Sequence, residues 1–172
     1  RIDAMIGFDF LSQSAVTIDY QSKKITVGPI DLSLIAIPYV AGTGYAVVEM
    51  KIARQTLLLL LDTGASDLVL FDSATRDCAN AIKNFGSQPW SNMGGDMRVR
   101  QVQLEDAFLG STPWGAQNVF ILPDSGGNQP GGLHGLLGVA ALKARRVSFD
   151  PERKVFAWDT QRRPAQLAKE AR

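Results

Sequence analysis

Residues 56–71 read TLLLLLDTGASDLVLF, and this stretch decides which fold the chain can adopt. Its first half contains an unbroken apolar run, Leu57–Leu61, which is typical of a β-strand buried on both faces. The run ends at Asp62, and an ionised carboxylate is costly to bury at the end of an apolar strand. We therefore expect Asp62 to lie in a turn where its charge has a use. The next residues suit such a turn, because Thr63 can donate and accept hydrogen bonds and Gly64 permits close backbone approach.

A second motif lies about a domain's length further on. GLLG at residues 135–138 has two hydrophobic residues and a glycine in front of a predicted short helix. An apolar strand followed by Asp-Thr-Gly-Ala-Ser, together with a downstream hydrophobic-hydrophobic-Gly, is the pattern of aspartic proteases. The chain therefore resembles the retropepsin-like family of aspartic proteases, especially its bacterial members with a single Asp-Thr-Gly. The resemblance covers roughly residues 45–158.

The resemblance implies a role for each residue of the two motifs. Asp62 would be the catalytic carboxylate. Thr63 would form the hydrogen bonds that join two active-site loops across a two-fold axis, and Gly64 would bring its N–H close to the carboxylate. Ala65 and Ser66 would complete the supporting loop. The hydrophobic-Gly motif would pack beneath this loop and hold it rigid, and it consists of Leu136, Leu137 and Gly138.

Hydrolysis of a peptide bond by this route needs two carboxylates that share one proton, because two like charges ~3 Å apart cannot both ionise. This chain offers one Asp-Thr-Gly, at Asp62. The second carboxylate must come from another copy in a homodimer or from an upstream lobe of the same polypeptide, and the sequence leaves both open. The substrate would be a peptide or protein, with no cofactor and no metal. The rival hypothesis is a binding or regulatory domain that keeps the fold without proteolysis.

Aspartic proteases cover their substrate with a mobile hairpin, the flap. The segment PWSNMGGDMRV at residues 89–99 lies between the Asp strand and the Leu-Leu-Gly motif, where the family places its flap. Its glycine pair would supply mobility at the tip, although an ordinary hairpin turn has a similar composition. The segment departs from the family in lacking a clear flap tyrosine. The residues predicted to form the tip or to close on substrate are Trp90, Met93, Gly94, Gly95 and Met97.

An internal repeat connects the beginning of the chain with its end. Residues 7–27 align with residues 138–158 without a gap, at an offset of 131, with five identities in 21 positions. Both segments read as a glycine turn, a short helix and a two-stranded hairpin, so a duplicated unit is more probable than chance similarity. We therefore predict that residues 1–28 are the C-terminal remnant of an upstream, similar unit.

The predicted fold class is all-β. We expect a closed barrel of the retropepsin type, with one short helix after the Leu-Leu-Gly motif and a further short helix near residues 73–83. The predicted organisation after the remnant is a linker or strand, the protease domain, and a polar tail, at residues 29–44, 45–158 and 159–172.

Composition argues against several other classes of protein. The 18 basic and 17 acidic residues give a formal net charge of +1, which provides no support for a nucleic-acid partner. The longest apolar run, Leu57–Leu61, is far shorter than the ~20 residues of a membrane-spanning helix. The single cysteine, Cys78, excludes an internal disulfide and is more typical of a small semi-buried residue than of a nucleophile.

Two further patterns carry less weight. Asp-Ser-Gly at Asp124 is a variant of Asp-Thr-Gly, but it follows Pro123 and leads into a Gly/Pro-rich loop instead of a strand. The motif therefore lacks the strand–turn–strand context that its chemistry needs. His134 is the only histidine, and one histidine cannot build a typical zinc site, so we interpret it as a loop residue.

Ala65 predicts the pH dependence of the proposed activity. Pepsin-type enzymes usually carry serine at this position, and a serine hydroxyl beside the carboxylate would stabilise its ionised form. With Ala65 we expect the carboxylate pair to hold its shared proton to higher pH, and activity to peak at a less acidic pH. A measured pH–activity profile with its optimum at about pH 2 would contradict this prediction.

Overall fold

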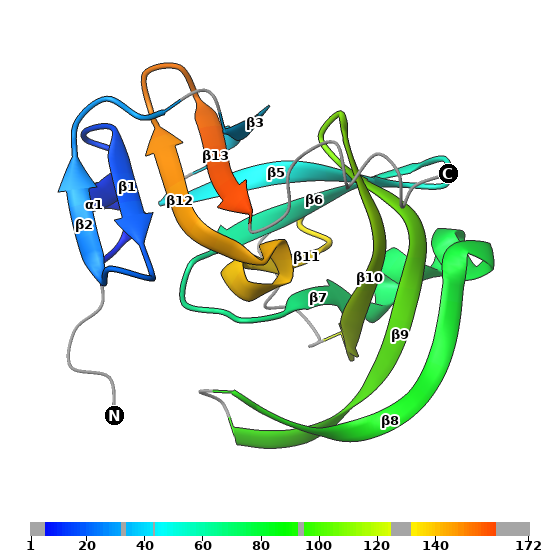
Figure 1. The fold of residues 1–172 in the computed structure, drawn as a ribbon. Coiled ribbons are helices and arrows are strands. Elements are labelled where there is room, and N and C mark those ends of the chain that lie inside the picture. Colours follow the sequence, from blue (N-terminus) through cyan, green and yellow to red (C-terminus); the bar gives the residue numbers. More distant parts are fainter. Residues whose placement is uncertain (1–5, 32–33, 43, 93–94, 125–131, 161–172) are drawn as a thin grey trace.

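The computed structural model describes residues 6–31, 34–42, 44–92, 95–124 and 132–160, and these residues form a mostly β structure (Figure 1). The prediction of a β-rich fold is confirmed in this coarse form. The described elements are α1 (Phe8–Leu11), β1 (Val16–Asp19), β2 (Lys24–Val27), β3 (Ile35–Pro38), β4 (Val40–Gly42), β5 (Tyr45–Ile52), β6 (Gln55–Asp62), β7 (Leu68–Phe71), η1 (Asp72–Ala81), β8 (Ile82–Asn92), β9 (Gly95–Leu109), β10 (Thr112–Leu122), β11 (Gly135–Gly138), η2 (Val139–Leu142), β12 (Ala144–Asp150) and β13 (Val155–Thr160).

The strands form two sheets. The five-stranded sheet has the order β2-β1-β12-β13-β3, and the eight-stranded sheet has the order β4-β5-β6-β11-β7-β10-β9-β8. In the second sheet β5 also pairs with β9, through Met50↔Leu109 and Lys51↔Phe108. Figure 1 shows the smaller sheet against one end of the larger one, with α1 beside β1 and β2.

The core contains buried residues from strands of both sheets, such as Leu59 of β6 and Phe156 of β13. Alternate residues of β6, Leu57 and Leu59, are buried, whereas Leu58 and Leu60 are only half-buried. The expectation of a strand buried on both faces is therefore wrong in this detail. Successive side chains of a strand point to opposite faces, and only one face of β6 packs into the central cluster.

Among the described residues, short helices lie near the three places where the sequence predicts them. The helix after the Leu-Leu-Gly motif is the 3₁₀ helix η2, and the helix predicted near residues 73–83 is the 3₁₀ helix η1. The α-helix among the described residues is α1, near the start of the chain. Gly138 caps η2 without a side-chain hydrogen bond, and a left-handed residue, Lys143, ends it after one turn. None of the described helices is long and apolar enough to span a membrane.

The segments on both sides of the predicted protease domain contain strand residues. Residues 29–44, predicted as a linker or strand, contain β3, which pairs with β13, and β4, which pairs with β5. The polar tail was expected from residue 159, but β13 continues to Thr160. Residues 161–172 of the tail lie outside the described residues.

The hairpins of the two repeat segments have the same register, although the helix in front of the first is the α-helix α1 and the helix in front of the second is the 3₁₀ helix η2. In the first hairpin Val16 pairs with Val27, and in the second Val147 pairs with Trp158, at the same offset of 131. The turns match as well, because the Ser22 N–H donates to Asp19 Oδ1 at 2.8 Å and the equivalent Arg153 N–H donates to Asp150 Oδ1 at 2.9 Å. Lys23 and its equivalent Lys154 both adopt a left-handed conformation, with φ of 56° and 53°.

Candidate active site

Asp62 is the last residue of β6, at the point where this strand leaves the sheet. Its backbone pairs with Gly138, the last residue of β11. Asp62 Oδ1 accepts a hydrogen bond from the Gly64 N–H at 2.9 Å, and the Ala65 N–H donates to the Asp62 carbonyl oxygen at 3.2 Å. These bonds close a compact turn, residues 62–67, called here the Asp62 loop. The Asp62 side chain lies at its start, half-buried at the border between the apolar core and solvent.

The strand that lies against the Asp62 loop is β11, although it is distant from the loop in sequence. This short strand lies between β6 and β7, parallel to the first and antiparallel to the second. It therefore passes directly beneath the loop that connects those two strands. Three backbone hydrogen bonds join β11 and η2 to the loop: Gly138 N–H to Asp67 O at 2.9 Å, Val139 N–H to Ala65 O at 3.0 Å, and Ala141 N–H to Ser66 O at 3.0 Å.

Position 138 requires glycine because there is no room for a side chain. Its φ of −79° and ψ of 151° are ordinary extended values that any residue adopts. A Cβ at this position, however, would lie 2.6 Å from the backbone N and O of Asp67 and from the carbonyl carbon of Ser66. The rest of the motif supports the same segment, since Leu137 is fully buried in the core and Leu136 is half-buried opposite Leu60.

Tyr20 contacts the Asp62 loop, and sequence reasoning did not select it. It follows β1 directly, and its hydroxyl donates to the Thr63 carbonyl oxygen at 3.4 Å. Partial burial raises the pKa of the Tyr20 phenol, and the charge of Asp62 raises it further. The phenol therefore stays protonated and acts as a donor beside the carboxylate. The contact joins residues 43 positions apart, and no local pattern in the sequence signals it.

His134 was interpreted as a loop residue, but the structure assigns it a specific place. Its ring Nδ1 accepts the Leu58 backbone N–H at 3.0 Å, and the His134 backbone N–H donates to the Leu58 carbonyl oxygen at 2.8 Å. Its carbonyl oxygen accepts the Phe71 N–H at 2.9 Å. His134 thus continues the pairing of β11 with both neighbouring strands. Because Nδ1 is an acceptor here, the neutral ring carries its proton on Nε2.

The predicted flap falls on the closed end of a long, curved hairpin formed by β8 and β9 (Figure 1). Trp90 pairs with Met97 across this hairpin, and Gly95 has a φ of 117° that favours glycine. Two residues of the predicted tip, Met93 and Gly94, lie outside the described residues. Closure of the hairpin over the Asp62 loop therefore stays a prediction.

The other candidate residues lie elsewhere. Asp124 accepts hydrogen bonds from the Ser73 N–H at 3.1 Å and the Ser73 hydroxyl at 2.9 Å, so its carboxylate stabilises the segment after β7. The rest of the Asp-Ser-Gly-Gly motif is outside the described residues. Cys78 is buried in the core, more deeply than the semi-buried position expected from the sequence. Within the described ranges, no group of three or more His, Cys, Asp or Glu residues is placed to hold a metal ion.

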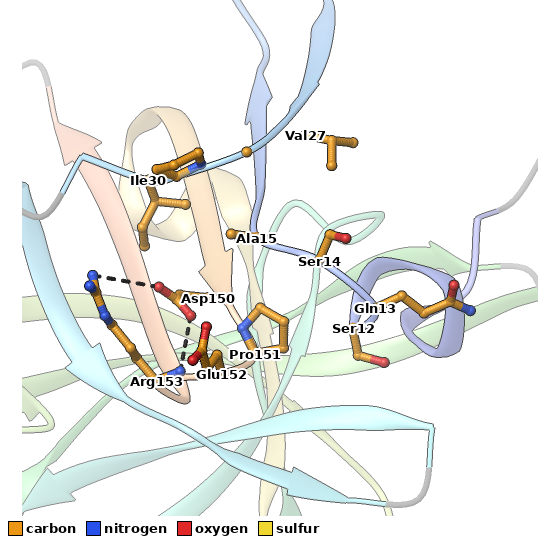
Figure 2. A pocket seen from close by; sticks show the side chains of 12 residues that line it. Ser12, Gln13, Ser14, Ala15, Val27, Ile30, Asp150, Pro151, Glu152 and Arg153 are labelled. Atoms are coloured by element: carbon orange, nitrogen blue, oxygen red, sulfur yellow. Dashed lines mark hydrogen bonds and ion pairs between the residues drawn. The ribbon is translucent and has the colours of Figure 1, made fainter.

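A cavity of about 740 Å³ lies at the other end of the smaller sheet (Figure 2). Its walls come from the chain before β1, the chain after β2, and the turn between β12 and β13. The Asp150 side chain faces this turn, where it bonds the Arg153 N–H at 2.9 Å and lies 3.8 Å from the Arg153 guanidinium. Tyr20, which contacts the Asp62 loop, is at the opposite end of β1, so this cavity is separate from the Asp62 carboxylate.

Comparison with known proteins gives limited information. No family model and no curated protein matches the sequence. Among solved structures, a retropepsin-like aspartic protease from Rickettsia conorii matches with 16% identity over 64% of this chain and 88% of that chain, at a TM-score of 0.47. Similarity of this degree is too low to assign a family or an activity, and the function proposed below rests on the geometry of the Asp62 loop.

Gly138→Ala tests the close approach beneath the loop. Its methyl group would meet backbone atoms at 2.6 Å, so the Asp62 loop must shift, and we expect a loss of about 1–3 kcal/mol in the free energy of unfolding. The matched control is Gly7→Ala, at the equivalent position of the repeat, where the Cβ meets the flexible end of the Asp9 side chain. Urea denaturation of both variants measures the difference, and equal losses would contradict this account.

His134→Leu tests the hydrogen bond to β6. The substitution leaves the Leu58 N–H without its acceptor, and we expect it to cost about 1–2 kcal/mol of unfolding free energy. His134→Asn is the matched variant, because the asparagine Oδ1 offers an acceptor close to the position of Nδ1. Chemical denaturation should therefore rank wild type and His134→Asn above His134→Leu. The reverse order would exclude this role for the imidazole.

Proposed function

We propose that the chain is a lobe of an aspartic endopeptidase, in which Asp62 supplies one of two catalytic carboxylates. One observation carries the proposal: Asp62 lies at the mouth of a turn whose backbone is fixed from beneath by three hydrogen bonds to β11 and η2. A general acid or base must be held in place if it is to act on a bound substrate. The Asp62 loop holds its carboxylate through main-chain hydrogen bonds, from the Gly64 N–H to the carboxylate and from β11 and η2 to the loop backbone.

The proposed chemistry requires a second carboxylate from another copy of the chain or from an upstream lobe. One carboxylate, ionised, takes a proton from a water molecule, whose oxygen attacks the carbonyl carbon of the scissile bond. The other, protonated, donates to the carbonyl oxygen. Collapse of the tetrahedral intermediate breaks the C–N bond, and the leaving amine takes up a proton from the pair. Thr63, whose carbonyl oxygen receives the Tyr20 hydroxyl, would join the two loops through its side chain.

The finer features of the fold belong to the same proposal. The pairing of β5 with both β6 and β9 supports a closed barrel of the retropepsin type. The β8–β9 hairpin would act as the flap, with Trp90 and Met97 near its tip on the substrate side. The alternative function is a binding domain that keeps this architecture and lacks proteolysis. The intact Asp62 loop favours the enzyme, because a binding domain has no need for an immobilised carboxylate at this strand end.

Asp62→Asn tests the proposal directly. The amide keeps the size of the side chain and its acceptor oxygen for the Gly64 N–H, but it can neither take up nor release a proton. We expect cleavage of an unfolded protein substrate to fall by about 10²–10⁴-fold. The assembly that forms the active pair must be used for this measurement, so activity is followed across protein concentration and in the complete natural polypeptide.

Asp106→Asn provides the matched control. Asp106 is exposed on β9 with a φ of 53°, a conformation that asparagine also tolerates. This variant should cleave at the wild-type rate. Equal activity of wild type and Asp62→Asn would reject the catalytic assignment and leave the binding domain as the better hypothesis.

A further inference from the structure

A local two-fold axis relates the two hairpins of the smaller sheet. β1 pairs antiparallel with β12, and Thr17 lies directly opposite Ser148, its equivalent in the repeat. Their hydroxyl oxygens are 2.8 Å apart. The pairing on either side is reciprocal. Val16 pairs with Phe149, and Ile18, the equivalent of Phe149, pairs with Val147, the equivalent of Val16. The axis therefore passes between Thr17 and Ser148.

The sheet obeys this axis except at one edge. On one side the order is β12, β13, β3, and on the other side it is β1, β2 with no further described strand. β3 pairs with the outer edge of β13, through Ile37↔Phe156 and Ala36↔Ala157. Rotation about the two-fold axis places the equivalent of this pairing at the outer edge of β2. The place beside β2 is thus shaped for an extended strand equivalent to β3.

Burial shows the same asymmetry. Phe156 and Trp158 of β13 are 1% and 2% exposed, because they pack against the larger sheet. Their equivalents on β2, Ile25 and Val27, are 51% and 64% exposed. Ile6 repeats the pattern, with 50% exposure where the equivalent Leu137 has 1%. The first hairpin presents to solvent the apolar face that the second one buries against its own barrel strands.

We propose that the exposed apolar face of β2, at Ile25 and Val27, docks onto a second β lobe of the same kind, which precedes residue 6 in the natural polypeptide. In the second unit the equivalent residues are the closing hairpin of their own lobe, directly continuous with it through β11. A second copy of this chain does not suit the place, because the hairpin β12–β13 already closes its lobe. The occupant is therefore a lobe whose own closing hairpin is β1–β2.

The cavity in Figure 2 agrees with this arrangement. The axis carries Tyr20 to Pro151, at the same offset of 131. Tyr20 contacts the loop of Asp62 through Thr63, so the corresponding loop of the second lobe would lie against Pro151. Pro151 lines the open cavity, together with Val27 and Asp150. The cavity is the place that the axis assigns to the second lobe's loop.

The same axis identifies the proposed second lobe as the source of the second carboxylate. Tyr20 lies three residues from Thr17, about 10 Å along the strand, and its side chain reaches the Asp62 loop. The axis places the second lobe's loop at the other end of these hairpins, beside Pro151, and that loop would carry the second carboxylate. This catalytic half of the inference rests on the function proposed above, whereas docking of the lobe on β2 does not.

Hydrogen exchange of the β2 amides tests the docking. The outward N–H groups of Lys24–Val27 have no described strand beside them, so they should exchange rapidly in this 172-residue chain. In the complete natural polypeptide, pairing with the second lobe should slow them by about tenfold or more. Equal exchange of the β2 peptide in the two proteins would overturn the proposal.

A matched pair of variants separates docking from folding. Val27→Lys places a charge on the proposed interface, and Val40→Lys places one on β4, another edge strand. The two positions are matched in exposure, because the Val27 side chain is 64% exposed and the Val40 side chain is 62% exposed. In the 172-residue chain both variants should keep the wild-type melting temperature. In the natural polypeptide Val27→Lys should abolish the slowed exchange of β2, and Val40→Lys should retain it. Loss of protection in both variants, or in neither, would contradict docking at this face.

Oligomeric state and activity distinguish this inference from the proposed function. A 172-residue chain that forms an active homodimer sensitive to Asp62→Asn would support the peptidase and overturn the preceding lobe. A natural polypeptide with protected β2 amides and no Asp62-dependent cleavage would support the lobe and reject the peptidase. A monomeric natural polypeptide with both properties is the result we expect.

Discussion

The backbone clamp between β11 and the Asp62 loop is the constraint on which the rest of the structure depends. β11 has only four residues, yet it holds β6 and β7 together and closes the turn between them from below. The clamp uses main-chain groups, so it depends little on side-chain identity except at Gly138, where a Cβ has no room. A turn fixed in this way can vary its outward side chains without losing its shape.

Asp62 lies at the end of β6, where an ionisable side chain can follow a buried strand and still reach solvent. Full burial of a carboxylate would cost several kcal/mol or shift it to its neutral form. At the end of β6 the backbone still follows the apolar core through Leu59, while the side chain reaches the surface and accepts the Gly64 N–H. The Tyr20 phenol stands close by as a donor that remains protonated. The site therefore combines a rigid support with access to solvent.

The sequence predicted the features that are local. The apolar strand, the turn at Asp62, the GLLG segment and the repeated hairpins are each encoded within a few neighbouring residues. The contacts of His134 and Tyr20 join β11 to β6 and β1 to the Asp62 loop, across 76 and 43 positions, and no local periodicity reports them. The helix types could not be predicted for a different reason. The end of η2 is set by a left-handed Lys143 and its start by hydrogen bonds to the loop, which are tertiary constraints.

The exposed edge of β2 is difficult to explain for a sheet that ends there. Proteins protect edge strands with charge, proline, bulges or covering segments, because an open edge promotes association. β2 carries Lys24 at its beginning, but Ile25 and Val27 point a continuous apolar face outward. The equivalent hairpin has the same register, the same turn and the same left-handed lysine, and it buries this face completely. Two hairpins so alike in backbone differ in burial because, among the described residues, only one of them packs against the larger sheet.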